Sequence, residues 1–233
     1  MPASTRDALS AVDALSPVDG RYRSATEPLR HLLSEAGLIR ERIRVEAQWL
    51  LHLSASVPQL AGASLNAEVV ARARQLAHEP DADAAAAVKA IEARTNHDVK
   101  AVEYYVREQL SAAGAGEATL EVVHFACTSE DINNLSYARI LQAARTLLLE
   151  TFATRVNELT TLAHRYADTA MLARTHGQPA SPTTLGRSLP TSRPACAVRK
   201  SAGRRLRFSA SGMARWVISM RTWPPHRPRT GRR

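Results

Sequence analysis

Apolar positions recur at helical spacing through most of the first 186 residues. Between Leu29 and Leu53 they fall three or four residues apart, which predicts one or two helices with a single buried side. A shorter helix is expected from about Leu65 to Ala77, before a break at 78–81. Ala84 to Glu92 is rich in strong helix formers and predicts another helix. The pattern therefore predicts an all-α protein.

The next predicted helix, over 94–110, has a definite start. Its apolar face consists of Val99, Val102, Val106 and Leu110. Thr95 is expected to cap this helix, with Asp98 three residues on as in a capping box. Two interpretations of Asn96, His97 and Asp98 carry about equal weight. Either Asn96 and Asp98 cap the helix, or the site binds an anion at the unsatisfied amides, with His97 able to share a proton with Asp98 or a ligand, and the two roles are compatible.

The longest periodic pattern follows a helix-start signature, with hydroxyls at Thr128 and Ser129 and acids at the next two positions. Its apolar stripe is Leu141, Leu148, Phe152, Val156, Leu159, Ala163 and Tyr166. The stripe predicts one long helix, or two nearly collinear ones, packed in a bundle, and a continuous helix from Ile132 to Tyr166 would be roughly 50 Å long. Without bundle partners the stripe would be exposed. Asn133 and Asn134 are poor helix formers, so we expect one at the surface and the other in a functional or inter-helix hydrogen bond.

A polar connector, Met171 to Gly186, follows this helix. Pro179, Pro182 and Gly177 oppose a helix there, because proline lacks the N–H donor and glycine costs backbone entropy. The connector carries His176, whose imidazole titrates near neutral pH, and helical scaffolds commonly place chemistry on such loops. Alone, a Thr-His-Gly tripeptide would be an ordinary polar turn.

A second loop candidate lies near the start of the chain. Pro17 and the Asp19-Gly20 pair predict a turn, which puts Arg21 and Tyr22 at its exit. An arginine at this place could bind a phosphate or carboxylate bidentately. By itself it could equally be a solvated side chain.

Composition adds little to this picture. Aromatic residues make up only 5% of the 233 residues, which favours helices over sheets. The two cysteines give neither a disulfide framework nor metal-ligand spacing, so we expect a reducing compartment. No apolar run of about 20 residues and no signal-peptide pattern occurs. We therefore expect a cytoplasmic protein without membrane contact.

The net charge of +9 comes entirely from the C-terminal part of the chain. Residues 1–186 hold all 22 acidic residues against 18 basic ones, whereas 187–233 hold 13 basic residues, five prolines and no acid. Such a tail would bind polyanions in a salt-sensitive, sequence-indifferent way. One alternative is therefore a basic-tailed, nonspecific nucleic-acid-binding helical protein, but the tail has no recognisable binding motif.

Four stretches in order, SPVDGRY, RTNHDVKAVEYY, HFACTSEDINNLS and ARTHGQPASPTTLG, resemble the bacterial adenylosuccinate lyases of the fumarase/aspartase superfamily. The resemblance covers residues 16 to about 186. It implies a helical N-terminal domain over 1–117, the start of a central helical bundle over 118–186, and a homotetramer with active sites shared between subunits. The long TNHDVKAVEYY form argues against another superfamily lyase such as argininosuccinate lyase.

The resemblance also implies a reaction. This family eliminates fumarate from adenylosuccinate, giving AMP, and from the succinylated imidazole-carboxamide ribotide of purine biosynthesis, with no metal or organic cofactor. His176 matches its general acid, a role that suits an imidazole. The positions that match its substrate contacts are Arg21, Tyr22, Asn96, His97, Asp98, Thr128 and Ser129.

The resemblance stops at about Gly186. The family's general base, a serine on a flexible loop, has no counterpart here, so we expect this chain alone to be inactive. Residues 187–233 look like an out-of-frame translation. When the codons of Gly212 to Pro224 are read from each third base, they permit Asn-Gly-Ala-Val-Gly-Asn-Phe-Asn-Ala-His-Leu-Ala, which closely resembles the NGAVGNYNAH segment of the family. The nucleotide sequence around the Gly186 codon tests this hypothesis.

Overall fold

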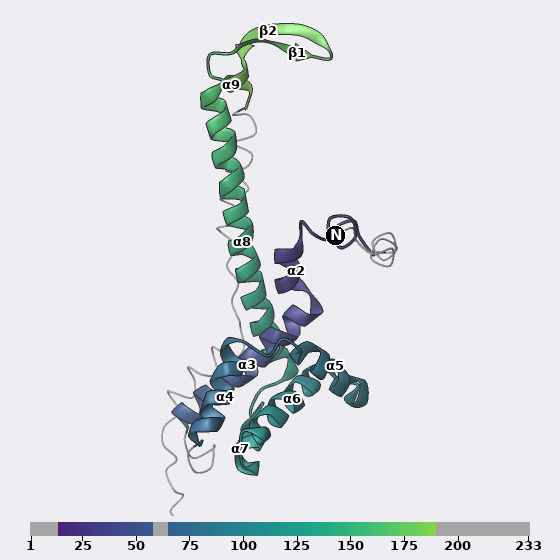
Figure 1. Ribbon diagram of the computed structural model, residues 1–233, viewed down its shortest axis with the longest axis vertical. Helices are drawn as coiled ribbons and strands as arrows, with labels where there is room; N and C mark the ends of the chain where they lie inside the picture. Colours follow the sequence, from purple (N-terminus) through teal and green to yellow (C-terminus); the bar gives the residue numbers. More distant parts are fainter. Residues whose placement is uncertain (1–13, 58–64, 190–233) are drawn as a thin grey trace, which may run out of the picture. The chain divides into compact units, whose positions relative to one another are not determined.

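The computed structural model describes residues 14–57 and 65–189, which form two compact units (Figure 1). Unit 1 lies within residues 14–140 and unit 2 within 141–189. Helices dominate the described residues, so the predicted helical fold is confirmed. The tail from residue 190 lies outside the described residues, and the domain boundary at 117/118 stays a prediction.

The helices α2 to α6 of unit 1 occupy the segments that the periodicity predicts, whereas α7 was not predicted. Their bounds are α2 Glu27–Leu33, α3 Glu35–Ser56, α4 Ala67–His78, α5 Ala84–Thr95, α6 Asp98–Ala112 and α7 Glu117–Val122. α2 and α3 are separated by Ser34, whose hydroxyl caps α3 by accepting a hydrogen bond from the Gly37 N–H at 3.2 Å. Gly37 lies close to α2, and a Cβ there would be 2.2 Å from the Leu32 carbonyl oxygen.

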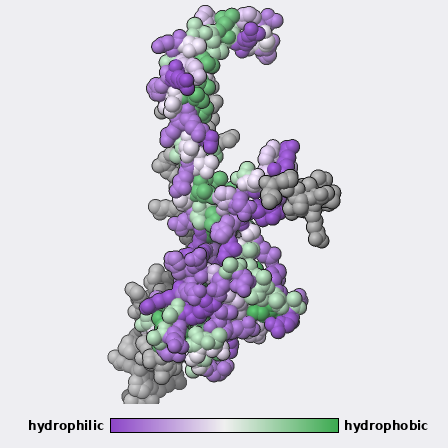
Figure 2. Space-filling view, viewed as in Figure 1, coloured by the Kyte–Doolittle hydropathy of each residue, from purple (hydrophilic) through white to green (hydrophobic). Residues whose placement is uncertain are grey.

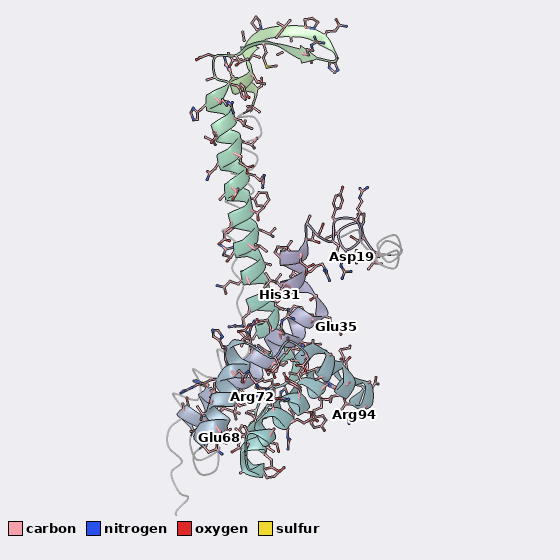
Figure 3. The ribbon with its side chains drawn as sticks, in the orientation of Figure 1. Asp19, His31, Glu35, Glu68, Arg72 and Arg94 are labelled. Carbon is pink, nitrogen blue, oxygen red and sulfur yellow. The ribbon has the colours of Figure 1, made fainter. Side chains whose placement is uncertain are left out.

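The core of unit 1 forms where α3 packs on α4 and α6, and α5 packs on α6. Its largest fully buried side chains include Ile43, Leu50, Leu53, Leu76 and Leu110. Polar contacts tie the rim together. Arg72 of α4, labelled in Figure 3, pairs with Asp81 in the turn before α5, and the Tyr105 hydroxyl of α6 donates to the same carboxylate at 3.2 Å.

The start of α6 differs from the prediction. Thr95 is the last residue of α5, and its hydroxyl donates to the Ile91 carbonyl oxygen at 3.2 Å. Asn96 then adopts a left-handed conformation with φ of 50°, which ends α5 and redirects the chain. His97 is the N-cap residue of α6, so the predicted cap by Thr95 is wrong.

The predicted long helix is confirmed as α8, Ser129–Arg165, which contributes residues to both units. In unit 2 it is followed by β1 Ala170–Thr175, β2 Gln178–Thr184 and the short α9 Leu185–Ser188. The predicted polar connector is therefore largely an antiparallel hairpin (Figure 1).

A two-residue turn joins the two strands of this hairpin. His176 and Gly177 both have positive φ values, 49° and 78°, and such turns match the twist of paired strands. The prolines of β2 are tolerated because a two-stranded sheet consists only of edges.

Gly186 fixes the end of the hairpin within unit 2. Its N–H donates to the Tyr166 carbonyl oxygen at 2.7 Å, and the Leu185 N–H donates to that of Thr169 at 2.8 Å. A Cβ at position 186 would lie 2.3 Å from the Ala163 carbonyl oxygen, so only glycine fits without movement.

Much of the apolar surface of unit 2 is uncovered. Leu141 and Leu148 of the predicted stripe are 39% and 43% exposed, and Figure 2 shows hydrophobic beside polar surface along α8. The exposure expected of a bundle helix without its partners is confirmed at these two positions. Among the described helices, none combines the length and apolar character needed to span a bilayer.

Candidate active site

The first cluster of predicted site residues lies at the start of α6. Asn96, His97 and Asp98 are all exposed, as a ligand would require. His97 Nδ1 accepts a hydrogen bond from the Lys100 N–H at 3.2 Å and lies 3.6 Å from Asp98 Oδ1. His97, and neither Asn96 nor Asp98, is thus the residue that caps α6, while Asn96 ends α5 and Asp98 is the first residue of α6. Among the described residues, none forms a hydrogen bond with His97 Nε2, so a ligand could use this nitrogen.

A buried arginine connects this cluster to α8. Arg42 of α3 is 6% exposed, and its Nη2 donates to Asp98 Oδ2 at 2.8 Å. Its Nε donates to Asn133 Oδ1 at 2.9 Å. The expected inter-helix hydrogen bond therefore falls on Asn133, while Asn134 is the exposed one.

The contact with Arg42 also affects the charge of Asp98. Burial would raise the pKa of Asp98, but the Val99 N–H and the Arg42 charge outweigh it and hold that pKa below its usual range. Asp98 therefore stays ionised at neutral pH and can act as a hydrogen-bond acceptor.

The second cluster lies at the start of α8, one turn before Asn133. The Thr128 N–H and hydroxyl both donate to Asp131 Oδ2, at 2.9 and 2.8 Å, and the Asp131 N–H returns a hydrogen bond to the Thr128 hydroxyl at 3.3 Å. This reciprocal cap confirms the predicted helix start. Ser129 is the first helical residue and is half-buried.

The loop that leads into Thr128 is held in an uncommon conformation. His124 and Ala126 have positive φ values, 65° and 58°, which non-glycine residues seldom adopt. Two contacts with α3 hold the loop: Trp49 Nε1 donates to the Phe125 carbonyl oxygen at 2.9 Å, and His124 Nδ1 lies 2.5 Å from Glu46 Oε1. Strain of this kind is typical of functional segments.

Glu46 is a fully buried carboxyl group whose Oε2 has no hydrogen-bond partner within the described residues. Burial raises its pKa, against the opposing effect of His124, and the hydrogen bond that His124 donates to the Glu46 carboxylate raises the pKa of His124. The negative charge of Glu103 raises the pKa values of Glu46 and His124, and the positive charge of Lys100 lowers them. Both pKa shifts therefore favour the protonated forms of the two groups.

The sequence interpretation missed Arg42, Glu46 and His124. The first two lie at helical spacing with the core positions Ile39, Ile43 and Leu50, so a charged residue on the apolar face of α3 was the available signal. His124 is the first residue of the HFACTSEDINNLS stretch. Its backbone conformation and its partner became visible only in the fold.

Arg21 and Tyr22 follow the predicted turn, which is confirmed by a hydrogen bond from the Ser16 N–H to Asp19 Oδ1 at 2.9 Å. Asp19 is labelled in Figure 3. The Arg21 guanidinium lies 4.7 Å from the centre of the Tyr22 ring, and both side chains are exposed. Among the described residues, no hydrogen bond or ion pair connects them to the starts of α6 or α8.

Unit 2 contributes one predicted site residue, His176. It occupies the turn between β1 and β2 and is exposed to solvent. Unit 1 thus brings together two of the four sequence stretches through Arg42. The stretch with His176 belongs to unit 2.

Comparison with known proteins identifies the family. The model of the Lyase_1 family, described as "Lyase", matches residues 20–206. The chain belongs to this family. The match continues past Gly186, where the sequence interpretation placed the end of the resemblance.

Curated relatives of this lyase family member include the adenylosuccinate lyases of Vibrio cholerae, Escherichia coli K12 and Haemophilus influenzae. They are 44%, 41% and 44% identical to it over 78% of its length. The chain spans only about 40% of the length of these relatives.

Solved structures show the same fold. A fumarate lyase from Mesorhizobium sp. BNC1 matches 76% of the chain with a TM-score of 0.60 and 23% identity. The 3-carboxy-cis,cis-muconate lactonizing enzyme of Pseudomonas putida matches 78% with a TM-score of 0.61 and 22% identity. The chain covers 39% of each of these two structures.

Proposed function

We propose that this chain is part of an adenylosuccinate lyase. The reaction is β-elimination, which releases fumarate from adenylosuccinate and from the succinylated imidazole-carboxamide ribotide. The observation that carries the proposal is identity of 41–44% to adenylosuccinate lyases over 78% of the chain. The four sequence stretches in their family order support it.

The proposed roles follow from the chemistry of the side chains. An exposed imidazole at His176 can protonate the nitrogen that departs when the succinyl C–N bond breaks. Arg21 can pair with a phosphate or a carboxylate, with Tyr22 beside it. The α6 and α8 starts, with Asn96, His97, Thr128 and Ser129, offer donors to the remaining anionic groups, while the ionised Asp98 can accept a hydrogen bond from the substrate.

The proposed enzyme is an assembly larger than this chain. The catalytic base is expected from a loop that the chain lacks, and the chain spans about 40% of its relatives. We propose a cytoplasmic homotetramer that shares its active sites between subunits and needs neither metal nor organic cofactor. Alone, the chain should release no fumarate.

Complementation tests this proposal. The chain is co-expressed with full-length E. coli adenylosuccinate lyase that is inactivated at the residue aligned with His176, and fumarate release from adenylosuccinate is followed by ultraviolet absorbance. A mixed assembly should regain activity because this chain supplies the missing acid. A chain with His176→Ala should restore nothing, whereas His164→Ala, an exposed histidine of α8 in the same unit, should restore as much as the unaltered chain.

Two results contradict the assignment. One is a co-purified mixed assembly with no fumarate release above that of the inactivated enzyme. The other is equal restoration by the unaltered chain and its His176→Ala variant.

A further inference from the structure

The N-cap hydrogen bond of α6 defines which nitrogen of His97 carries its proton. Nδ1 accepts from the Lys100 N–H at 3.2 Å, and a ring nitrogen that accepts has no proton of its own. Neutral His97 in this arrangement therefore holds its proton on Nε2. The ring nitrogen left free by the cap is then a hydrogen-bond donor.

A neighbouring carboxylate works against this arrangement. Asp98 Oδ1 lies 3.6 Å from His97 Nδ1, and a carboxylate at that distance favours a proton on Nδ1. Such a proton would abolish the cap from the Lys100 N–H. The observed geometry therefore needs something that draws the Asp98 charge away from the ring.

Arg42 is placed to supply this effect. Its guanidinium is almost fully buried and holds Asp98 Oδ2 at 2.8 Å, on the opposite carboxylate oxygen from the one near His97. The second hydrogen bond, to Asn133 Oδ1 at 2.9 Å, anchors the guanidinium to α8. An arginine fork satisfies both partners at once, which a lysine ammonium on a flexible stem does less well.

We propose that Arg42 is a positioning residue that keeps His97 in the tautomer with its proton on Nε2. His97 then donates a hydrogen bond to an anionic oxygen of the substrate and does not accept a proton from it. The identity of that ligand rests on the function proposed above. The tautomer itself is a property of the free chain and can be measured without any ligand.

Nitrogen NMR of the full chain with ¹⁵N-labelled histidine tests the proposal, at a pH where the His97 ring is neutral. The His97 signals are assigned from a His97→Gln variant. The unaltered chain should show an unprotonated Nδ1 and a protonated Nε2. In Arg42→Gln, which keeps an amide donor but loses the charge, the Nδ1 signal should shift toward the protonated position. Arg42→Lys should retain most of the original pattern.

The matched control is Arg139→Gln. Arg139 also connects α8 to α3, through a 2.7 Å contact of its Nε with Glu41 Oε2, but it does not touch Asp98. This control should leave the His97 signals unchanged. The Arg42→Gln/Asp98→Asn double variant should return them to the original pattern, because no carboxylate then attracts the proton.

The proposal is overturned if a folded Arg42→Gln chain keeps the original His97 signals, or if Arg139→Gln shifts them as much. A protonated Nδ1 in the unaltered chain overturns it as well, even if the Arg42 variants fail to fold. The complementation experiment tests the proposed function, and the NMR experiment tests the tautomer of His97. Either experiment can fail while the other succeeds, so the failure of one proposal can be told from the failure of the other.

Discussion

The buried contact between Glu46 and His124 allows a quantitative test of how unit 1 is stabilised. Glu46 is fully buried, while the side chain of His124 is 19% exposed. Removing either partner abolishes the same 2.5 Å contact but leaves the other in a different environment. We therefore expect His124→Leu to cost far more stability than Glu46→Leu.

The magnitudes follow from burial. His124→Leu leaves an uncompensated carboxyl group in the interior, which typically costs about 3–5 kcal/mol. Leucine adopts the left-handed conformation of residue 124 less readily than histidine, which adds to this cost. Glu46→Leu places an apolar side chain in the core and leaves an imidazole that water can reach, so its cost should stay below about 1.5 kcal/mol.

The double variant Glu46→Leu/His124→Leu isolates the coupling between the two residues, because the backbone strain at position 124 cancels from the cycle. The coupling free energy should be at least about 2 kcal/mol, given the usual cost of breaking a buried pair.

The pair also predicts a dependence on pH. Both pKa values are raised in the folded state, so the folded chain binds more protons than the unfolded chain. The stabilisation that His124 contributes is then fully present below about pH 6.5, the pKa of a histidine in the unfolded chain. The stabilisation that depends on a protonated Glu46 is lost separately, as Glu46 ionises. The stabilisation by His124 decreases as the pH rises through the raised pKa of His124 in the folded chain. In the double variant this decrease should be absent.

Trp49 provides the assay. It is 4% exposed and donates to the loop carbonyl oxygen next to His124, so its fluorescence reports on this part of unit 1. Urea unfolding is measured from pH 5.5 to 9, with Trp216 and Trp223 replaced by phenylalanine. Equal costs for the two single variants, or stability that increases with pH above 6.5 relative to the double variant, would refute the reasoning.

Two further predictions concern packing. Leu50→Ala, at a fully buried position of α3, should cost about 2–5 kcal/mol in urea unfolding, whereas Leu148→Ala, at a 43% exposed position of α8, should cost less than about 0.5 kcal/mol. Similar losses would contradict the burial. Gly186→Ala forces a methyl group toward the Ala163 carbonyl oxygen and should cost about 1–3 kcal/mol. Hydrogen exchange should then speed up in β1 and β2 while unit 1 amides keep their rates, and unchanged hairpin exchange would argue against the close approach.

Local patterns in the sequence were sufficient for most of the helices. The spacing of Val99, Val102 and Val106 identified the buried face of α6, because a helix repeats every 3.6 residues and all three are at most 1% exposed. Hydroxyl and acidic residues at Thr128 and Asp131 identified the start of α8, because a helix cap is made within four residues. These features depend only on residues that are close together in the sequence, so the sequence was enough to predict them.

The tertiary structure decided the contacts between segments far apart in the chain. Arg42 reaches Asp98 and Asn133 across 56 and 91 residues, and Glu46 reaches His124 across 78. Nothing in the sequence near Arg42 or Glu46 specifies those partners. Whether a charged residue on the apolar face of a helix is paired depends on which elements pack against it, and packing is a property of the whole fold.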